Sequence, residues 1–82
     1  MSGKWVRGAE RAAPREGVVL EVQPFELHGT KYFRVLFRLD GEPDLTREAR
    51  LSYDMIYVNP QPRDRVLVDL VLGVVDQMRK AG

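Results

Sequence analysis

The sequence contains no cysteine, one histidine and no long apolar segment. Without cysteine the chain forms no disulfide, and a single histidine does not anchor a zinc site of the usual composition. No apolar run approaches the roughly 20 residues that span a bilayer, and the N-terminus lacks the apolar core of a signal peptide. We therefore expect a cytoplasmic protein that uses no metal or cofactor, has no membrane partner, and is stabilised by packing or by a partner.

The chain also lacks the residue patterns of the common enzyme classes. Its glycines are isolated, so no phosphate-cradling loop is predicted, and no serine, histidine and acidic residue have the spacing of a nucleophilic triad. Asp40, Glu42 and Asp44 cluster, but a calcium loop needs a longer series of ligands, so this cluster is interpreted as a solvated turn. We predict that the protein is not an enzyme.

What the chain does contain is strict alternation between residues 31 and 40. The apolar face of this segment consists of Phe33, Val35, Phe37 and Leu39. The opposite face consists of Tyr32, Arg34, Leu36 and Arg38. Because successive side chains of a strand point to opposite faces, this pattern predicts a half-buried β-strand with an aromatic and arginine-bearing surface.

Four further segments are predicted as strands: Gly17–Gln23, Glu48–Ser52, Arg65–Leu72 and Val74–Arg79. In the first of them, Val18, Leu20 and Val22 are assigned to one face and Val19 to the other. Pro24 is expected to end this strand, because proline donates no hydrogen bond to a ladder. Residues 24–30 are then a loop that turns at Gly29 and covers one end of the core with Phe25 and Leu27.

Two segments leave alternatives open. Residues 53–58 continue the third strand or begin a helical turn after Ser52, a residue type favoured at helix N-termini. Residues 66–80 read either as two strands joined near Gly73 or as one helix with apolar residues every fourth position. Glycine and repeated valine disfavour the helix, so the two strands are preferred.

These elements predict an all-β fold with two parts. Residues 1–16 form a flexible basic tail that contains Trp5, and residues 17–82 form a single small β-barrel domain. Five short strands separated by turns suit a closed five-stranded barrel, which leaves no free sheet edge. An OB-fold is preferred, and an SH3-like barrel is the alternative.

A set of residues between 17 and 79 resembles bacterial translation initiation factor one and related small RNA-binding domains. The matching positions, in chain order, are Gly17-Val18-Val19, Glu21, Pro24, Phe33-Arg34-Val35, Gly41, Ala49, Ser52, Met55, Pro62, Asp64-Arg65-Val66, Val68, Gly73 and Val75. The resemblance implies an OB-fold and binding of RNA.

The outward face of the second and third predicted strands is the candidate site. Its proposed nucleic-acid-binding residues are Lys31, Tyr32, Arg34, Arg38 and Arg50. A tyrosine ring stacks on bases, and guanidinium groups pair with phosphates or stack on bases. The predicted function is therefore non-enzymatic binding of single-stranded RNA or DNA, with RNA preferred. In the competing interpretation, the arginines only pair with Glu21, Glu48 or Asp69 on a solvated sheet.

The alternative function is a protein-interaction or assembly module, in which the partner is another protein or a second copy of the chain. It rests on apolar residues assigned to outward positions, which are Val19, Leu36, Ile56, Tyr57, Leu67 and Val71. The net charge of +1 is compatible with either function. At so low a net charge, binding of a polyanion would depend on a local basic patch.

Overall fold

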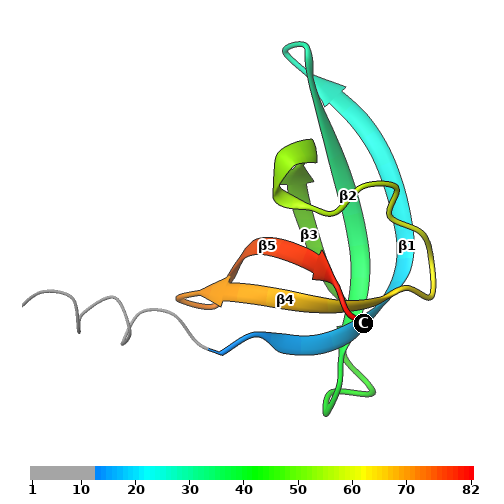
Figure 1. Ribbon diagram of the computed structural model, residues 1–82, viewed down its shortest axis with the longest axis vertical. Coiled ribbons are helices and arrows are strands. Elements are labelled where there is room, and N and C mark those ends of the chain that lie inside the picture. The colour runs from blue at the N-terminus through cyan, green and yellow to red at the C-terminus, as the bar shows by residue number, and fades with distance from the viewer. Residues whose placement is uncertain (1–12) are drawn as a thin grey trace, which may run out of the picture.

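The alternating segment forms an interior strand, the second from one edge, of a five-stranded antiparallel sheet in the computed structural model, which describes residues 13–82 (Figure 1). The elements are β1 (Arg15–Leu27), β2 (Thr30–Leu39), β3 (Arg47–Ser52), the 3-10 turn η1 (Tyr53–Met55), β4 (Arg65–Val71) and β5 (Val74–Lys80). Trp5 and most of the predicted tail lie outside the described residues. The first strand begins at Arg15, so residues 15 and 16 belong to the sheet.

The five strands are arranged in the order β3-β2-β1-β4-β5, and all neighbours are antiparallel. This confirms an all-β, barrel-like fold. The ends of the sheet approach each other through one isolated parallel bridge between Ile56, after β3, and Met78 of β5. Strand pairing therefore does not close the barrel, in contrast to the closed barrel that we predicted.

The core lies on the predicted apolar face of β2. Val35, Phe37 and Leu39 are at most 1% exposed, and Phe33 packs against the core from one end. Ala49 of β3 joins them, as alternation predicts. The other buried apolar residues are Val19, Leu51, Ile56, Val66, Val68, Leu70 and Met78. One strand of strict period two thus locates the main apolar cluster.

The facing of β1 was predicted wrongly. Val19 points into the core and is fully buried, whereas Val18 is only half-buried. The cause is a β-bulge: Val19 pairs with Phe37 and Glu21 pairs with Leu36, which leaves Leu20 as an extra residue. A bulge resets the alternation, so Val22, beyond it, again packs against the core.

The strand also continues past Pro24, where we predicted its end. β1 pairs with β4 only over residues 15–18, so at Pro24 it has a neighbour on one side only. Proline is tolerated in such an edge strand, because the missing N–H can face the open side. β1 and β2 then meet in a tight turn at His28-Gly29, whose φ angles are 53° and 80°. Leu27 is 50% exposed and does not cover the core.

The C-terminal segment forms two strands, which rules out the helix alternative. Three alternate β4 positions, Val66, Val68 and Leu70, face the core, but Leu72 is 77% exposed and belongs to the turn. Asp69 is also buried, next to a register shift after this residue. Arg79 of β5 neutralises it, since Nε and Nη2 of the arginine donate to the two carboxylate oxygens, each at 3.2 Å.

The ambiguous segment after β3 is a single 3-10 turn. Ser52 stands at its N-cap position with an extended backbone, but its hydroxyl donates to the Asp54 carboxylate at 2.6 Å. The turn is followed by Ile56, which enters the core, and by Asn59, which has a φ of 59°. Within residues 13–82 no helix is long and apolar enough to cross a membrane.

Candidate nucleic-acid interface

Four of the five predicted site residues lie on one face of the sheet, which we call the outer face. Tyr32, Arg34 and Arg38 alternate along β2 with the core residues, and Arg50 of β3 pairs directly with Arg34. Lys31 does not join them. It lies beside Phe33 on the other face, as strand alternation requires, with its Nζ atom 5.3 Å from the Phe33 ring centroid.

An aromatic pair occupies one end of the outer face. Phe25 of β1 is the cross-strand partner of Tyr32, and their rings stack with centroids 5.5 Å apart and planes 17° from parallel. Phe25 was not among the predicted site residues, because Pro24 was expected to end the strand before it. Its even spacing from Gln23 was the signal that could have placed it on this face.

A shared carboxylate holds two of the predicted arginines. Arg34 Nε donates to Glu48 Oε2 at 2.9 Å, and Arg50 Nε donates to the same oxygen at 3.3 Å. Arg34 also donates to Gln23 Oε1 at 3.4 Å. The hydrogen bond from Arg34 holds the pKa of Glu48 below its usual value, so this carboxylate is charged at neutral pH. The predicted pairing with Glu48 is thus present for Arg34 and Arg50.

Arg38 differs from these two residues. Its Nε is buried without a hydrogen-bond partner, and no ion pair joins it to another described residue. Its cross-strand neighbour is Val18, which offers no acceptor side chain. The residue as a whole is only half-buried, so the part of its guanidinium that reaches solvent can pair with an anionic oxygen of a ligand without breaking an internal ion pair.

A shallow hollow lies on the same face. It has a volume of about 390 Å³ and is lined by Gln23, Pro24, Phe25, Arg34 and Arg50. The lining therefore combines one aromatic ring with two guanidinium groups, which is the combination used to stack and pair nucleotides. Arg50 is the more accessible of the two arginines, with 69% of its side chain exposed against 35% for Arg34.

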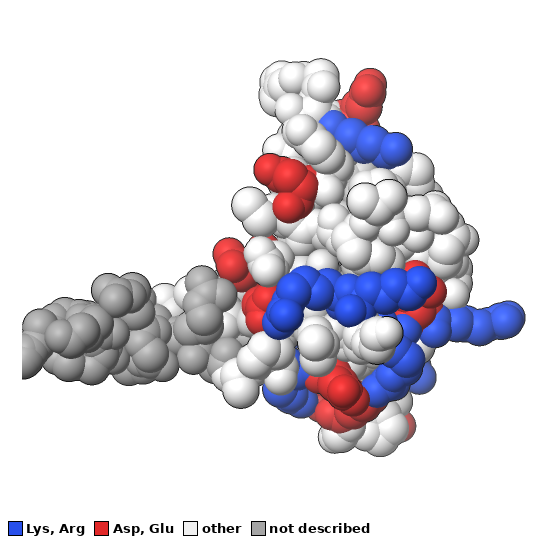
Figure 2. Space-filling view, viewed as in Figure 1, with Lys and Arg blue, Asp and Glu red and all other residues white. Residues whose placement is uncertain are grey.

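Most other basic residues are neutralised locally. Arg65 pairs with Asp40 and Glu16, and Arg47 pairs with Glu42 at 2.9 Å. Hydrogen bonds from Arg65 and Arg47 lower the pKa values of Asp40 and Glu42, respectively. Figure 2 shows the consequence over the lower half of one face, where basic and acidic side chains lie side by side. No large field of one sign results on that face.

The apolar residues that were assigned to outward positions are buried or half-buried in the structure. Val19 and Ile56 are core residues, Leu36, Leu67 and Val71 are half-buried, and Tyr57 packs against the core. The large apolar side chains that are exposed instead are Leu27, Leu45, Tyr53, Met55, Val58, Leu72 and Val74. They lie mainly in turns and in η1, where strand alternation gives no information.

The outer face therefore offers an aromatic pair, a hollow beside two paired arginines, and one arginine without a partner among residues 13–82. Glu48 is the only acid in the middle of this arrangement that pairs with its arginines. The chain was compared with protein-family models, with curated proteins and with solved structures, and it matches none of them.

Proposed function

We propose that the barrel is an OB-fold. The support comes from the strand order, in which the long β1 pairs with both β2 and β4 and the end of the β3–η1 segment meets β5 in parallel. The proposal keeps the resemblance to translation initiation factor one at the level of fold. Those factors carry a basic run after the matching methionine, where this chain has Ile56-Tyr57-Val58 with Ile56 buried.

We further propose that the outer face binds single-stranded nucleic acid, with RNA as the preferred ligand and the cytoplasm as the location. The observation that carries the proposal is Arg38, a guanidinium without a partner on the same strand face as Tyr32. An anionic phosphate would satisfy Arg38, and a base would extend the Phe25–Tyr32 stack. In OB-folds the face formed by strands two and three is the usual oligonucleotide surface.

The arginines have different expected roles. Arg38 contacts phosphate directly, because no acceptor among residues 13–82 competes for it. Arg34 and Arg50 must share the ligand with Glu48, so they position a base in the hollow more than they contribute net positive charge. Lys31 has no role on this face, because it lies on the other side of β2.

Fluorescence anisotropy of labelled single-stranded RNA and DNA, at low and moderate salt, tests the proposal. We expect binding that weakens as salt is added. The Arg38→Glu variant and the Arg34→Glu/Arg38→Glu double variant should both abolish it. Arg63→Glu is the matched control, because Arg63 is exposed, has no ion pair in the described part of the chain and belongs to the loop before β4, not to β1, β2 or β3. Glu48→Gln should tighten binding, since it removes the central negative charge.

Unchanged affinity of the Arg38→Glu variant would contradict the proposal, as would equal loss in Arg38→Glu and Arg63→Glu. Equal loss would indicate that only net charge matters. The slope of log affinity against log salt is informative too, because each lost phosphate contact on a single strand lowers it by about 0.7.

A second candidate function is protein interaction through the β4–β5 turn. Leu72 and Val74 are 77% and 68% exposed there, which is unusual for adjacent large apolar residues. A mass measurement across a range of protein concentrations distinguishes the candidates. Self-association that Leu72→Ser abolishes would favour an assembly role, whereas a monomer at all concentrations would exclude pairing of two copies through this turn.

A further inference from the structure

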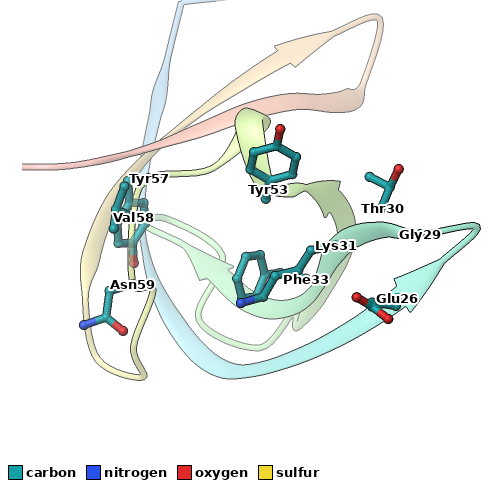
Figure 3. Close-up of a pocket in the computed structure, with 9 residues that line it drawn as sticks. All are labelled: Glu26, Gly29, Thr30, Lys31, Phe33, Tyr53, Tyr57, Val58 and Asn59. Atoms are coloured by element: carbon teal, nitrogen blue, oxygen red, sulfur yellow. The ribbon is translucent and has the colours of Figure 1, made fainter.

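A second cleft lies on the opposite side of β2 from the outer face, between the β1–β2 hairpin and the segment that follows β3 (Figure 3). Its volume is about 500 Å³. Among its lining residues only Lys31 was a predicted site residue, and the proposed function does not use the cleft. The side chains that matter to the argument are Phe33, Tyr53, Tyr57, Lys31, Glu26 and Asn59.

Three aromatic rings from three parts of the chain border this cleft. Phe33 comes from β2, Tyr53 from η1 and Tyr57 from the segment after it; in Figure 3, Tyr53 and Phe33 lie on facing sides of the opening. Tyr53 is 60% exposed, although burial would be favourable for so large a ring. Tyr57 is fixed, because its hydroxyl donates to Asp64 at 2.7 Å.

The cleft also contains a cation that is not neutralised. Lys31 is the cross-strand partner of Glu26, yet no ion pair between them is present among the described residues. The ammonium instead lies over Phe33, at 5.3 Å from the ring centroid. Figure 3 shows Glu26 toward the hairpin turn and away from the Tyr57 end of the cleft. Positive charge and aromatic surface therefore meet at one point, and the acid lies to the side.

The cleft is not isolated from its surroundings. A neighbouring hollow of about 520 Å³ shares Lys31, Phe33 and Asn59 with it and is walled by Pro60 and Pro62. The side-chain amide nitrogen of Asn59 is free to donate, since the carbonyl oxygen of that amide accepts from Gln61 at 3.0 Å. The two hollows therefore adjoin each other at Lys31, Phe33 and Asn59.

We propose that this cleft binds one nucleotide unit, with the base stacked on Tyr53 and the phosphate at Lys31, whose ammonium lies over the Phe33 ring. Aromatic faces stack on any base, an ammonium pairs with phosphate as a point charge, and the Asn59 amide can donate to a base edge. The unit is either a residue of a bound single strand or a free mononucleotide. As a strand residue it rests on the proposed function; as a free nucleotide it does not.

The test is a titration of the full-length chain with AMP and with UMP, monitored by NMR chemical shifts. Parallel titrations with adenosine and with inorganic phosphate serve as the comparison. Both mononucleotides should bind more tightly than adenosine alone or inorganic phosphate alone. Tyr53→Ala should weaken AMP and adenosine alike, by about tenfold, as expected for loss of one stacking ring. Lys31→Gln should weaken AMP about fivefold and leave adenosine unchanged, since only AMP carries the phosphate.

One further variant shows whether the cleft prefers an anionic or a cationic ligand, by the direction in which it changes the affinity for AMP. Glu26→Gln should strengthen AMP binding, because it removes a negative charge from the wall. If Glu26→Gln weakens binding and Lys31→Gln strengthens it, the cleft selects a cation and the proposal is wrong. Met55→Ala is the matched control: Met55 is exposed on the same 3-10 turn but does not line the cleft.

Two further measurements distinguish this site from the outer face and identify whether the nucleotide is free or part of a strand. Arg38→Ala should impair oligonucleotide binding and leave AMP binding intact, so either proposal can fail without the other. Displacement of AMP by unlabelled single-stranded RNA identifies the occupant as part of a strand, and retention identifies a free nucleotide. Absence of AMP and UMP binding at millimolar concentration overturns the proposal.

Discussion

Replacing Gly17 by alanine tests the close approach of β1 to β2 at this position. Gly17 lies where β1 pairs with two strands at once, opposite Leu39 of β2 and Val66 of β4. A Cβ atom at this position would stand 2.5 Å from the carbonyl oxygen of Arg38 and 3.2 Å from a methyl carbon of Leu39. Ordinary contact begins near 3.4 Å, so the two strands would have to separate by nearly an ångström.

The expected loss follows from three effects. Overpacking against rigid groups costs typically 1–3 kcal/mol, and here the obstructing atom is backbone, which places the cost toward the upper end. The adjacent hydrogen bond from Asp40 N to Glu16 O, now 2.9 Å, would lengthen as the strands part. The lower backbone entropy of unfolded alanine offsets about 0.5–1 kcal/mol. We therefore expect a net loss of about 2 kcal/mol.

Urea denaturation followed by far-UV circular dichroism measures this change. A domain of this size has a total stability of roughly 4–12 kcal/mol, so a loss of about 2 kcal/mol shifts the midpoint clearly. Gly29→Asn is the control, because a side chain at Gly29 meets no atom within 4 Å and asparagine tolerates its φ of 80°. Equal stability of the Gly17→Ala variant and the wild-type chain would refute the close approach of β1 to β2.

Three further predictions concern stability. Leu72→Asn should raise the melting temperature by a few degrees, because Leu72 has a φ of 53° in a two-residue turn that favours asparagine, and an unchanged melting temperature would count against this. Arg79→Ala should cost about 1–2 kcal/mol in urea, less than for a fully buried pair, because Asp69 stays buried but 48% of the Arg79 side chain is exposed. Tyr57 and the Gln61 amide hold the pKa of Asp64 below its ordinary value, so its contribution is present above about pH 4 and is lost as pH falls through the folded pKa. Asp64→Asn should flatten the acid-unfolding curve below that pH, and curves parallel to those of the wild type would contradict the assignment.

Strand β2 was predictable because one physical constraint decided it. It lies between β1 and β3 with one face on the core, so period two survives from Lys31 to Leu39. The turn residues were predictable for the same kind of reason, because Gly29, Gly41 and Gly73 all have positive φ, which other residues adopt at a cost.

β1 was harder, because its facing depends on pairing rather than on pattern. The sequence Val18-Val19-Leu20 is apolar on both faces, so alternation alone does not show where the bulge lies. The position of Pro24 was misread for a related reason. Whether a proline ends a strand depends on whether a neighbour needs its N–H, and that is decided by where β4 stops pairing.

Four of the five candidate site residues were predicted on the correct face, whereas Lys31 was not. The alternation of β2 places Tyr32, Arg34 and Arg38 together, as expected. It does not reveal that Glu48 sits diagonally between Arg34 and Arg50, because this contact depends on the register of β3. The second cleft could not be predicted for the same reason, because its rings come from β2, η1 and the following segment and meet only in the folded chain.

The two proposed sites are separated by a single strand, and this makes them separately accessible to experiment. β1 pairs with β4 only over its first four residues, so the far half of the β1–β2 hairpin extends beyond β4 (Figure 1), and its two faces border different hollows. Even-numbered β2 residues such as Tyr32 and Arg38 then serve the outer face, while Lys31 and Phe33 serve the cleft. Substitutions one position apart therefore probe different surfaces with almost the same effect on the strand itself. If Tyr32→Ala and Lys31→Gln changed the affinity for AMP equally, the hairpin would not divide the two surfaces as this geometry requires.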